Sequence, residues 1–253
     1  MHTATRSAVL LVLLTLVLST APVRAETINC TAITALPAVI TVQGIYCFTG
    51  NLNTAMTSGN AIDIQTSNVV LDLNGFKLGG LAAGLGTQTY GIHALNRQNI
   101  TIKNGTVRGF LFGIRLEDTG TSQGHVIEDM RADQNTSVAF DIQGSGNIVR
   151  NNQVVATGGT TIFGANTDAI GILVFGDGPR VLNNDVIKTV KQGTGASIGI
   201  FFQVVTSALA VNNRITEADV GIEYFSGTGK YRDNLTFTVT TPYTGGMDAG
   251  NND

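Results

Sequence analysis

A short alternating strand pattern recurs seven times along this chain of 253 residues, and this repeat restricts the fold more than any other feature. Each copy begins with five residues of which the second and fourth are apolar. The copies are AIDIQ, GIHAL, GIRLE, AFDIQ, GILVF, GIFFQ and GIEYF, which start at residues 61, 91, 113, 139, 171, 199 and 221. Period-two alternation puts the apolar residues on one face of a strand, so seven stacked copies form one continuous core.

The spacing between successive copies is 22 to 32 residues, which suits one coil of three short strands and three turns. No helical pattern of about ten residues separates the strands, so an alternating strand–helix sheet is disfavoured. Charged residues make up only 13% of the chain, and its 31 glycines favour tight turns. We therefore predict an all-β chain that forms a right-handed parallel β-helix of about seven coils.

The first 25 residues are predicted to be a secretory signal peptide. Arg6 supplies a positive start, an apolar run extends from Ala8 to Leu18, and Val23-Arg24-Ala25 places small residues at a cleavage site. The run of eleven apolar residues is too short for a membrane span of roughly 20. We expect a secreted or periplasmic protein with no membrane span after cleavage.

The remaining chain is expected to have three parts. These are an N-terminal cap with the first incoming strand at 26–60, the parallel β-helix at 61–239 and an irregular C-terminal tail at 240–253. Cys30 and Cys47 are the two cysteines, and in an exported protein we expect them to form a disulfide that staples the cap. A metal site is the alternative, but no histidine lies near them in the sequence.

A polar residue follows the second strand at the same position in six successive coils. This column consists of Asn104, Asp129, Asn151, Asn183, Asn212 and Asp233. Asparagine tolerates the left-handed conformation that a sharp corner requires. We predict that these side chains point inward, where stacked amides can bond to the coils above and below, and that the ladder is structural.

The asparagine pairs at this corner, in RNNQV, LNNDV and VNNRI, are typical of parallel β-helix repeat proteins, the pectate-lyase-like superfamily. The chain resembles this superfamily over residues 45 to 237. Its members include pectate lyases, polygalacturonases, alginate lyases, epimerases and many exported proteins of uncharacterised activity. The resemblance implies the fold and leaves the activity open.

The candidate binding site is the outward face of the first strand of each coil. Neighbours in a column of a parallel sheet lie about 4.8 Å apart, so the outward residues of the first four coils should lie in line. Those residues are Asp63, His93, Arg115 and Asp141, with Glu117 and Gln143 beside them. The later coils offer Phe175, Phe201 and Phe225 as rings on which sugars could stack. The alternative is a solvated face with ion pairs worth 0.2–1 kcal/mol each.

Three functions remain open. We expect an exported protein that binds a polysaccharide or other glycan on the first-strand face. The first alternative is a lyase that cleaves a uronic-acid polymer by β-elimination, with His93 as the base and Arg115 neutralising the substrate carboxylate. The second is a structural spacer with no ligand.

Other partners and motifs are less favoured. Loss of Arg6 and Arg24 with the signal peptide changes the net charge from −3 to −5, so nucleic acid is a poor partner. We predict no cofactor and no metal site; Ca²⁺ stays open as a ligand, although no acidic cluster matches a known calcium loop. Asn166-Thr167-Asp168 repeats a triplet of polygalacturonases, but its companion motifs are absent, so we interpret it as a chance match.

Overall fold

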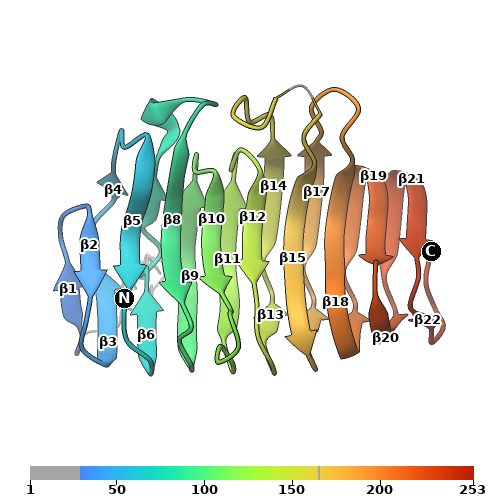
Figure 1. Ribbon diagram of the computed structural model, residues 1–253, viewed down its shortest axis with the longest axis horizontal. Helices are drawn as coiled ribbons and strands as arrows, with labels where there is room; N and C mark the ends of the chain where they lie inside the picture. Colours follow the sequence, from blue (N-terminus) through green and yellow to red (C-terminus); the bar gives the residue numbers. More distant parts are fainter. Residues whose placement is uncertain (1–28, 165) are drawn as a thin grey trace, which may run out of the picture.

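The computed structural model describes residues 29–164 and 166–253, which form a parallel β-solenoid of about eight turns. Its strands lie side by side along the long axis of the molecule (Figure 1), and the one short helix described is a 3-10 turn, η1 (Leu81–Ala83). The predicted parallel β-helix is confirmed, with about one turn more than expected. The predicted signal peptide at 1–25 lies outside the described residues.

The first strands of the coils form one wall of the solenoid, which we call the first-strand wall and which stands in front in Figure 1. It consists of β2 (Ala38–Ile40), β5 (Ser58–Ile64), β8 (Gln88–Leu95), β10 (Phe112–Glu117), β12 (Val138–Ile142), β15 (Ala169–Asp177), the first half of β18 (Ser197–Val211), and the second halves of β19 (Arg214–Tyr224) and β21 (Leu235–Thr244). All neighbours pair in parallel, and the predicted register holds throughout the seven copies.

Two further walls close each coil. The second-strand wall contains β1 (Thr31–Ile33), β3 (Gly44–Phe48), β6 (Val69–Asp72), the first parts of β9 (Ile100–Arg108) and β11 (Val126–Asp133), β13 (Ile148–Arg150), β16 (Arg180–Leu182), the end of β18, β20 (Gly227–Arg232) and β22 (Met247–Asp248). The third-strand wall contains β4 (Leu52–Asn53), β7 (Lys77–Gly79), β14 (Gln153–Gly158) and β17 (Asp185–Val190), with the ends of β9 and β11 and the starts of β19 and β21.

The core is the axial stack of inward side chains that the repeat predicts. The first inward residue of every copy is fully buried, and each such aliphatic or aromatic side chain contributes about 1.5–3 kcal/mol. At the C-terminal end the stack becomes aromatic. The rings of Phe202 and Tyr224 are stacked with centroids 4.3 Å apart, and those of Tyr231 and Tyr243 are 4.8 Å apart.

The predicted corner is present, but the inward orientation of its asparagines is wrong. Asn104, Asp129, Asn151, Asn183, Asn212 and Asp233 all have positive φ, between 53° and 56°, as the left-handed corner requires. Their side chains are nevertheless exposed or half-buried, although the amides of Asn151, Asn183 and Asn212 bond from coil to coil as predicted. The left-handed residue turns the chain and interrupts the period-two alternation, so the residue after it enters the core.

The second asparagine of each pair forms the buried ladder. Asn152, Asn184, Asn213 and Asn234 are buried, and Asn252 continues the series. The side-chain oxygen of Asn184 accepts bonds from the backbone N–H and the side chain of Asn152, both at 3.0 Å, and the amide of Asn184 bonds Asn213 in turn. Every amide of the ladder is therefore satisfied by the coil next to it.

Both ends of the described chain differ from the expected division into cap, helix and tail. The disulfide between Cys30 and Cys47 is present, but β2 and β3 in the capping segment already pair with the next coil. At the other end, β21 continues to Thr244 and β22 pairs with β20, where an irregular tail was expected. The solenoid thus extends into both segments.

Replacing one ladder asparagine should destabilise the fold strongly. In Asn184→Ala the buried N–H of Asn152 and carbonyl of Val149 lose their partner, which we expect to cost about 4 kcal/mol of unfolding free energy. Asn183→Gly is the matched control, because glycine keeps the positive φ without steric cost and removes only exposed amide bonds to Asn151 and Asn212, so stability should change by about 1 kcal/mol at most. Urea denaturation of both variants measures the difference; equal losses would contradict the assignment of the ladder to the second asparagine.

Candidate functional site

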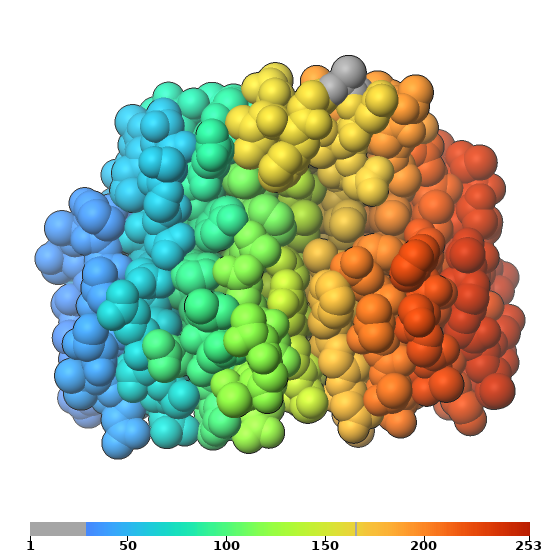
Figure 2. Space-filling model, in the orientation of Figure 1, coloured from blue at the N-terminus to red at the C-terminus, as the bar shows by residue number. Residues whose placement is uncertain are grey.

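The first-strand wall brings the outward residues of four successive coils into line. Asp63 pairs with His93, His93 with Arg115, and Arg115 with Asp141, on strands β5, β8, β10 and β12. The predicted column is therefore confirmed as an arrangement of neighbours. The loops at 80–87, 159–164 and 191–196 rise along one edge of this wall, at the top of Figures 1 and 2.

His93 is held between two carboxylates. Its Nδ1 lies 2.9 Å from Oδ1 of Asp63, and its Nε2 lies 2.8 Å from Oε2 of Glu117. An ionised carboxylate only accepts hydrogen bonds, and a neutral imidazole has one N–H to give. The side-chain nitrogen of Asn60 also lies 3.0 Å from Nδ1 of His93, so a ring with its proton on Nε2 can donate to Glu117 and accept from Asn60.

Arg115 continues the network into the next coil. Its Nη2 lies 2.8 Å from Oε1 of Glu117, its Nε lies 3.2 Å from Oδ2 of Asp141, and its Nη1 donates to the hydroxyl of Tyr90 at 2.6 Å. The guanidinium carbon also lies 4.5 Å from the ring centroid of Phe112 and 5.0 Å from that of Tyr90, within cation–π distance. These contacts hold the guanidinium in one position. We call the chain of contacts from Asp63 through His93, Glu117 and Arg115 to Asp141 the charged network.

The two ends of the charged network differ in protonation. Asp141 is only 2% exposed, and burial raises its pKa to about 6 although Gln143 and Arg115 act in the opposite direction. At Asp63 burial also favours the neutral form, but hydrogen bonds from His93 and Gln65 outweigh it, so the pKa of Asp63 is lowered. The carboxylate of Asp63 therefore stays ionised, while that of Asp141 exchanges a proton near pH 6.

The later coils make the same wall apolar. Leu173 and Phe201 continue the column, and the rings of Phe201 and Phe225 meet edge to face with centroids 6.1 Å apart. Phe225 is 67% exposed, so its ring is open to solvent, whereas Phe175 and Phe201 are half-buried. Gln143 lies beside Asp141 and donates to its carboxylate. All seven residues predicted to bind substrate thus come from one wall.

Sequence reasoning missed a second outward column on this wall. It consists of Tyr90, Phe112, Val138, Ile170, Ile198 and Val220, which are paired in register. Its central members are buried together with Leu173 in a hydrophobic cluster outside the main core. The sequence does contain a signal for this column. In every copy from the second onward, the residue two positions before the first inward residue is apolar or aromatic.

The other described histidine has a structural role. The backbone N–H of Ile100 donates to Nδ1 of His125, so the ring proton is on Nε2, which lies 2.7 Å from Oγ of Ser122. Burial lowers the pKa of His125 to about 4, so the ring is neutral at ordinary pH. In this tautomer it donates to the serine and cannot activate the serine as a nucleophile.

The polygalacturonase-like triplet also bonds to neighbouring backbone. Asn166 accepts a hydrogen bond from the backbone N–H of Thr194, and Asp168 accepts one from that of Ala196.

Among the residues described, no three His, Cys, Asp or Glu side chains are grouped so that they could hold a metal ion. The described part of the chain likewise has no helix long and apolar enough to cross a membrane.

Comparison with known proteins gives only distant structural similarity. No family model and no curated protein matches the chain. Two solved β-helix structures resemble it: a point variant of the catalytic domain of a GH87 alpha-1,3-glucanase with nigerose (11% identity, TM-score 0.41) and the catalytic domain of GH87 alpha-1,3-glucanase with nigerose (11% identity, TM-score 0.32). Each comparison covers 88% of this chain and 63% of the other, so the chain spans less than two thirds of these domains.

The raised pKa of Asp141 predicts a pH dependence of stability. The folded protein keeps a proton on Asp141 that the unfolded chain loses above its usual pKa of 3.8, so this residue destabilises the fold increasingly as the pH rises from about 4 to about 6. Relative to wild type, Asp141→Asn should therefore gain stability across this range, by roughly 2–3 kcal/mol.

Asp63→Asn provides a control of opposite sign. The pKa of Asp63 is lowered, so its contribution is present above the unfolded pKa and is lost as the pH falls. Asp63→Asn should thus lose stability relative to wild type as the pH rises. Denaturation curves at several pH values between about 3 and 7 measure both differences. If the unfolding free energies of wild type and Asp141→Asn changed with pH in parallel, the raised pKa of Asp141 would be contradicted.

Proposed function

We propose that this protein binds a polysaccharide along the first-strand wall. The observation that carries the proposal is the sequence of groups on that one wall: a fixed network of charged hydrogen-bonding side chains, followed along the axis by aromatic rings of which Phe225 is open. A glycan chain presents hydroxyl groups and apolar C–H faces in alternation. The wall offers a partner for each kind of group.

The rigidity of the wall supports this proposal. His93, Glu117 and Arg115 hold one another, and Arg115 is also fixed against Tyr90 and Phe112. Side chains that are already ordered lose little conformational entropy when a ligand binds. Aromatic rings add contact area at low entropic cost, which is useful for a ligand as polar as a sugar.

The charges favour an uncharged polysaccharide. The network contains the carboxylates of Asp63, Glu117 and Asp141 against one guanidinium and one imidazole, and the whole chain has a net charge of −3. An acidic surface repels a polyanion at long range. A neutral glycan does not meet this repulsion and can still accept hydrogen bonds from Arg115 and Gln143.

Lytic cleavage of a uronic-acid polymer is the second candidate. Its base would be His93 and its cationic group Arg115, which lie next to each other on β8 and β10. The contacts of His93 favour binding over lysis, because both ring nitrogens already have partners, Asp63 and Asn60 at Nδ1 and Glu117 at Nε2, so neither is free to take a proton from a substrate. A spacer role without a ligand is the third candidate.

We also propose that the protein is exported to an oxidising compartment. The disulfide between Cys30 and Cys47 supports this, because such bonds persist outside the cytosol. The signal-peptide pattern at 1–25 supports it independently. An exported protein meets extracellular or cell-wall glycans, which fits the proposed ligand.

Affinity electrophoresis in gels that contain single polysaccharides tests the proposal. We expect a neutral polysaccharide to retard the protein, with no gain in ultraviolet absorbance from unsaturated chain ends. Phe225→Ala should weaken the retarding interaction about fivefold to tenfold, the effect of one lost stacking ring. Phe237→Ala is the matched control, because Phe237 is 76% exposed and lies on the third-strand part of β21.

Each result separates the candidates. If a polysaccharide retards Phe225→Ala as strongly as Phe237→Ala, the binding site lies elsewhere and the proposed wall is contradicted. New absorbance that His93→Ala abolishes would show the lyase, while full activity in His93→Ala would exclude His93 as the base. No retardation by any neutral or acidic polysaccharide would leave the spacer role.

A further inference from the structure

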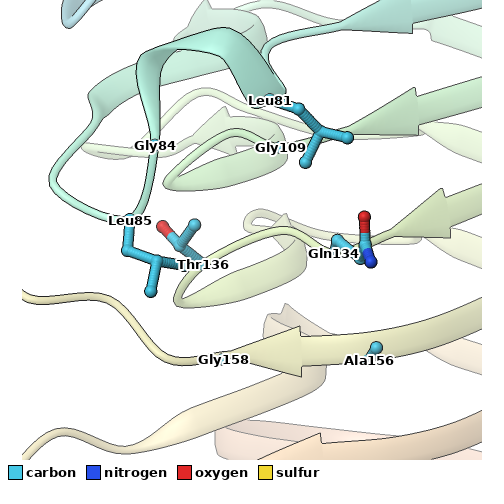
Figure 3. A pocket seen from close by; sticks show the side chains of 8 residues that line it. All are labelled: Leu81, Gly84, Leu85, Gly109, Gln134, Thr136, Ala156 and Gly158. Atoms are coloured by element: carbon cyan, nitrogen blue, oxygen red, sulfur yellow. The ribbon is translucent and has the colours of Figure 1, made fainter.

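A cavity of about 400 Å³ lies at the edge of the third-strand wall, beneath the loop that carries η1. Leu81, Gly84 and Leu85 form its outer side, and residues at the ends of β9, β11 and β14 form its floor (Figure 3). The floor residues are Gly109, Gln134, Thr136, Ala156 and Gly158. None of the lining residues is charged.

The loop over the cavity is held in place by the neighbouring coils. Gly80 N–H donates to the carbonyl of Arg108 at 2.8 Å, and Thr161 N–H donates to the carbonyl of Leu85 at 3.2 Å. Gly109 allows the close approach, because a Cβ there would lie 2.4 Å from the backbone nitrogen of Leu81. The cavity is therefore a built feature, in which two loops far apart in sequence are bonded to each other.

Two polar side chains belong to the floor, and one of them is buried without a hydrogen-bond partner. Thr136 is only 3% exposed, and its Oγ1 has no hydrogen-bond partner within the described structure, although its backbone N–H and carbonyl are both bonded. An unpaired buried hydroxyl costs about 1–3 kcal/mol, so it needs an explanation. Figure 3 shows this oxygen on the side of the loop that carries Gly84 and Leu85.

Gln134 supplies the second group. Its Oε1 accepts a hydrogen bond from Nη2 of Arg108 at 2.6 Å, which fixes the orientation of the amide. The NH₂ group of the amide is then the part that can donate to a ligand. Opposite these two groups, Leu81 and Leu85 are about half exposed and provide an apolar surface.

From this arrangement we infer that the cavity binds a single uncharged sugar residue that carries an acetyl group. The acetyl carbonyl would accept from the Gln134 amide, its methyl would pack on Leu81 and Leu85, and a ring hydroxyl would bond Thr136. A purely aliphatic ligand would leave both polar groups unpaired, and a charged one would find no counter-charge in the lining. The volume is near the lower end of small-molecule sites, which suits one residue and not a chain.

The test is a ligand-observed NMR titration of the full protein. The probes are the methyl glycosides of N-acetylglucosamine, N-acetylgalactosamine and N-acetylmannosamine, each against its uncharged parent, the methyl glycoside of glucose, galactose or mannose, in which a hydroxyl replaces the acetamido group. We expect at least one acetylated probe to bind about tenfold more tightly than its parent, because the parent leaves the amide and the leucines without partners. Equal binding of every pair, or binding by none of the acetylated probes, would overturn the inference.

Variants locate the site. Gln134→Glu keeps an oxygen for Arg108 but replaces the donor NH₂ by an acceptor, so the acetylated probe should bind about tenfold more weakly. Gln153→Glu is the matched control, because Gln153 bonds Arg131 in the same way and does not line the cavity. Thr136→Val should also weaken binding, while the urea midpoint stays equal or rises because an unpaired hydroxyl is removed. Unchanged probe binding in both Gln134→Glu and Thr136→Val would contradict the site.

Binding in the cavity is independent of the proposed binding on the first-strand wall. Phe225→Ala should leave the binding of the acetylated probe unchanged, since Phe225 does not line the cavity. Gln134→Glu should leave gel retardation by a neutral polysaccharide unchanged. A loss of probe binding in Phe225→Ala would place the probe on the first-strand wall and refute the cavity as its site.

Discussion

Parallel stacking in strict register is the constraint on which the structure depends. Each coil lies one strand spacing, about 4.8 Å, from the next, so a side chain meets the residue at the same position of the neighbouring coil. Inside the solenoid this rule gives an aliphatic stack and a ladder of buried amides such as Asn152, Asn184 and Asn213. A buried polar group is acceptable here because the coil above or below supplies its partner.

The same register produces the charged network on the outer surface. Asp63, His93, Glu117, Arg115 and Asp141 come from four strands that are far apart in the sequence, yet each contact joins neighbours on the wall. Exposed ion pairs are usually worth little, but this set includes a buried carboxylate and a guanidinium packed on two rings. The network orders a polar surface that then continues into the apolar part of the wall. An ordered amphipathic surface is what binding of a sugar chain requires.

The sequence was sufficient for the architecture and for the neighbours on the first-strand wall, because period-two alternation directly reports which residues share a face. It failed where the alternation is interrupted. The left-handed backbone conformation of Asn151 and Asn183 shifts the inward position to the following asparagine, and no periodic pattern in the sequence indicates that shift. The double contact of His93 depends on side-chain rotamers, and the cavity beneath Leu81 and Leu85 depends on two loops meeting in space. Neither is encoded in a local pattern.

The central claim is that the register of the coils builds one wall that binds a sugar chain. Diffraction from crystals soaked with an oligosaccharide of the polysaccharide that retards the protein tests this claim most directly. We predict sugar density along the first-strand wall, with one ring against Phe225 and hydroxyl groups within hydrogen-bond distance of Arg115 or Gln143. Density confined to another wall, such as the asparagine corner at Asn151, Asn183 and Asn212, would contradict it.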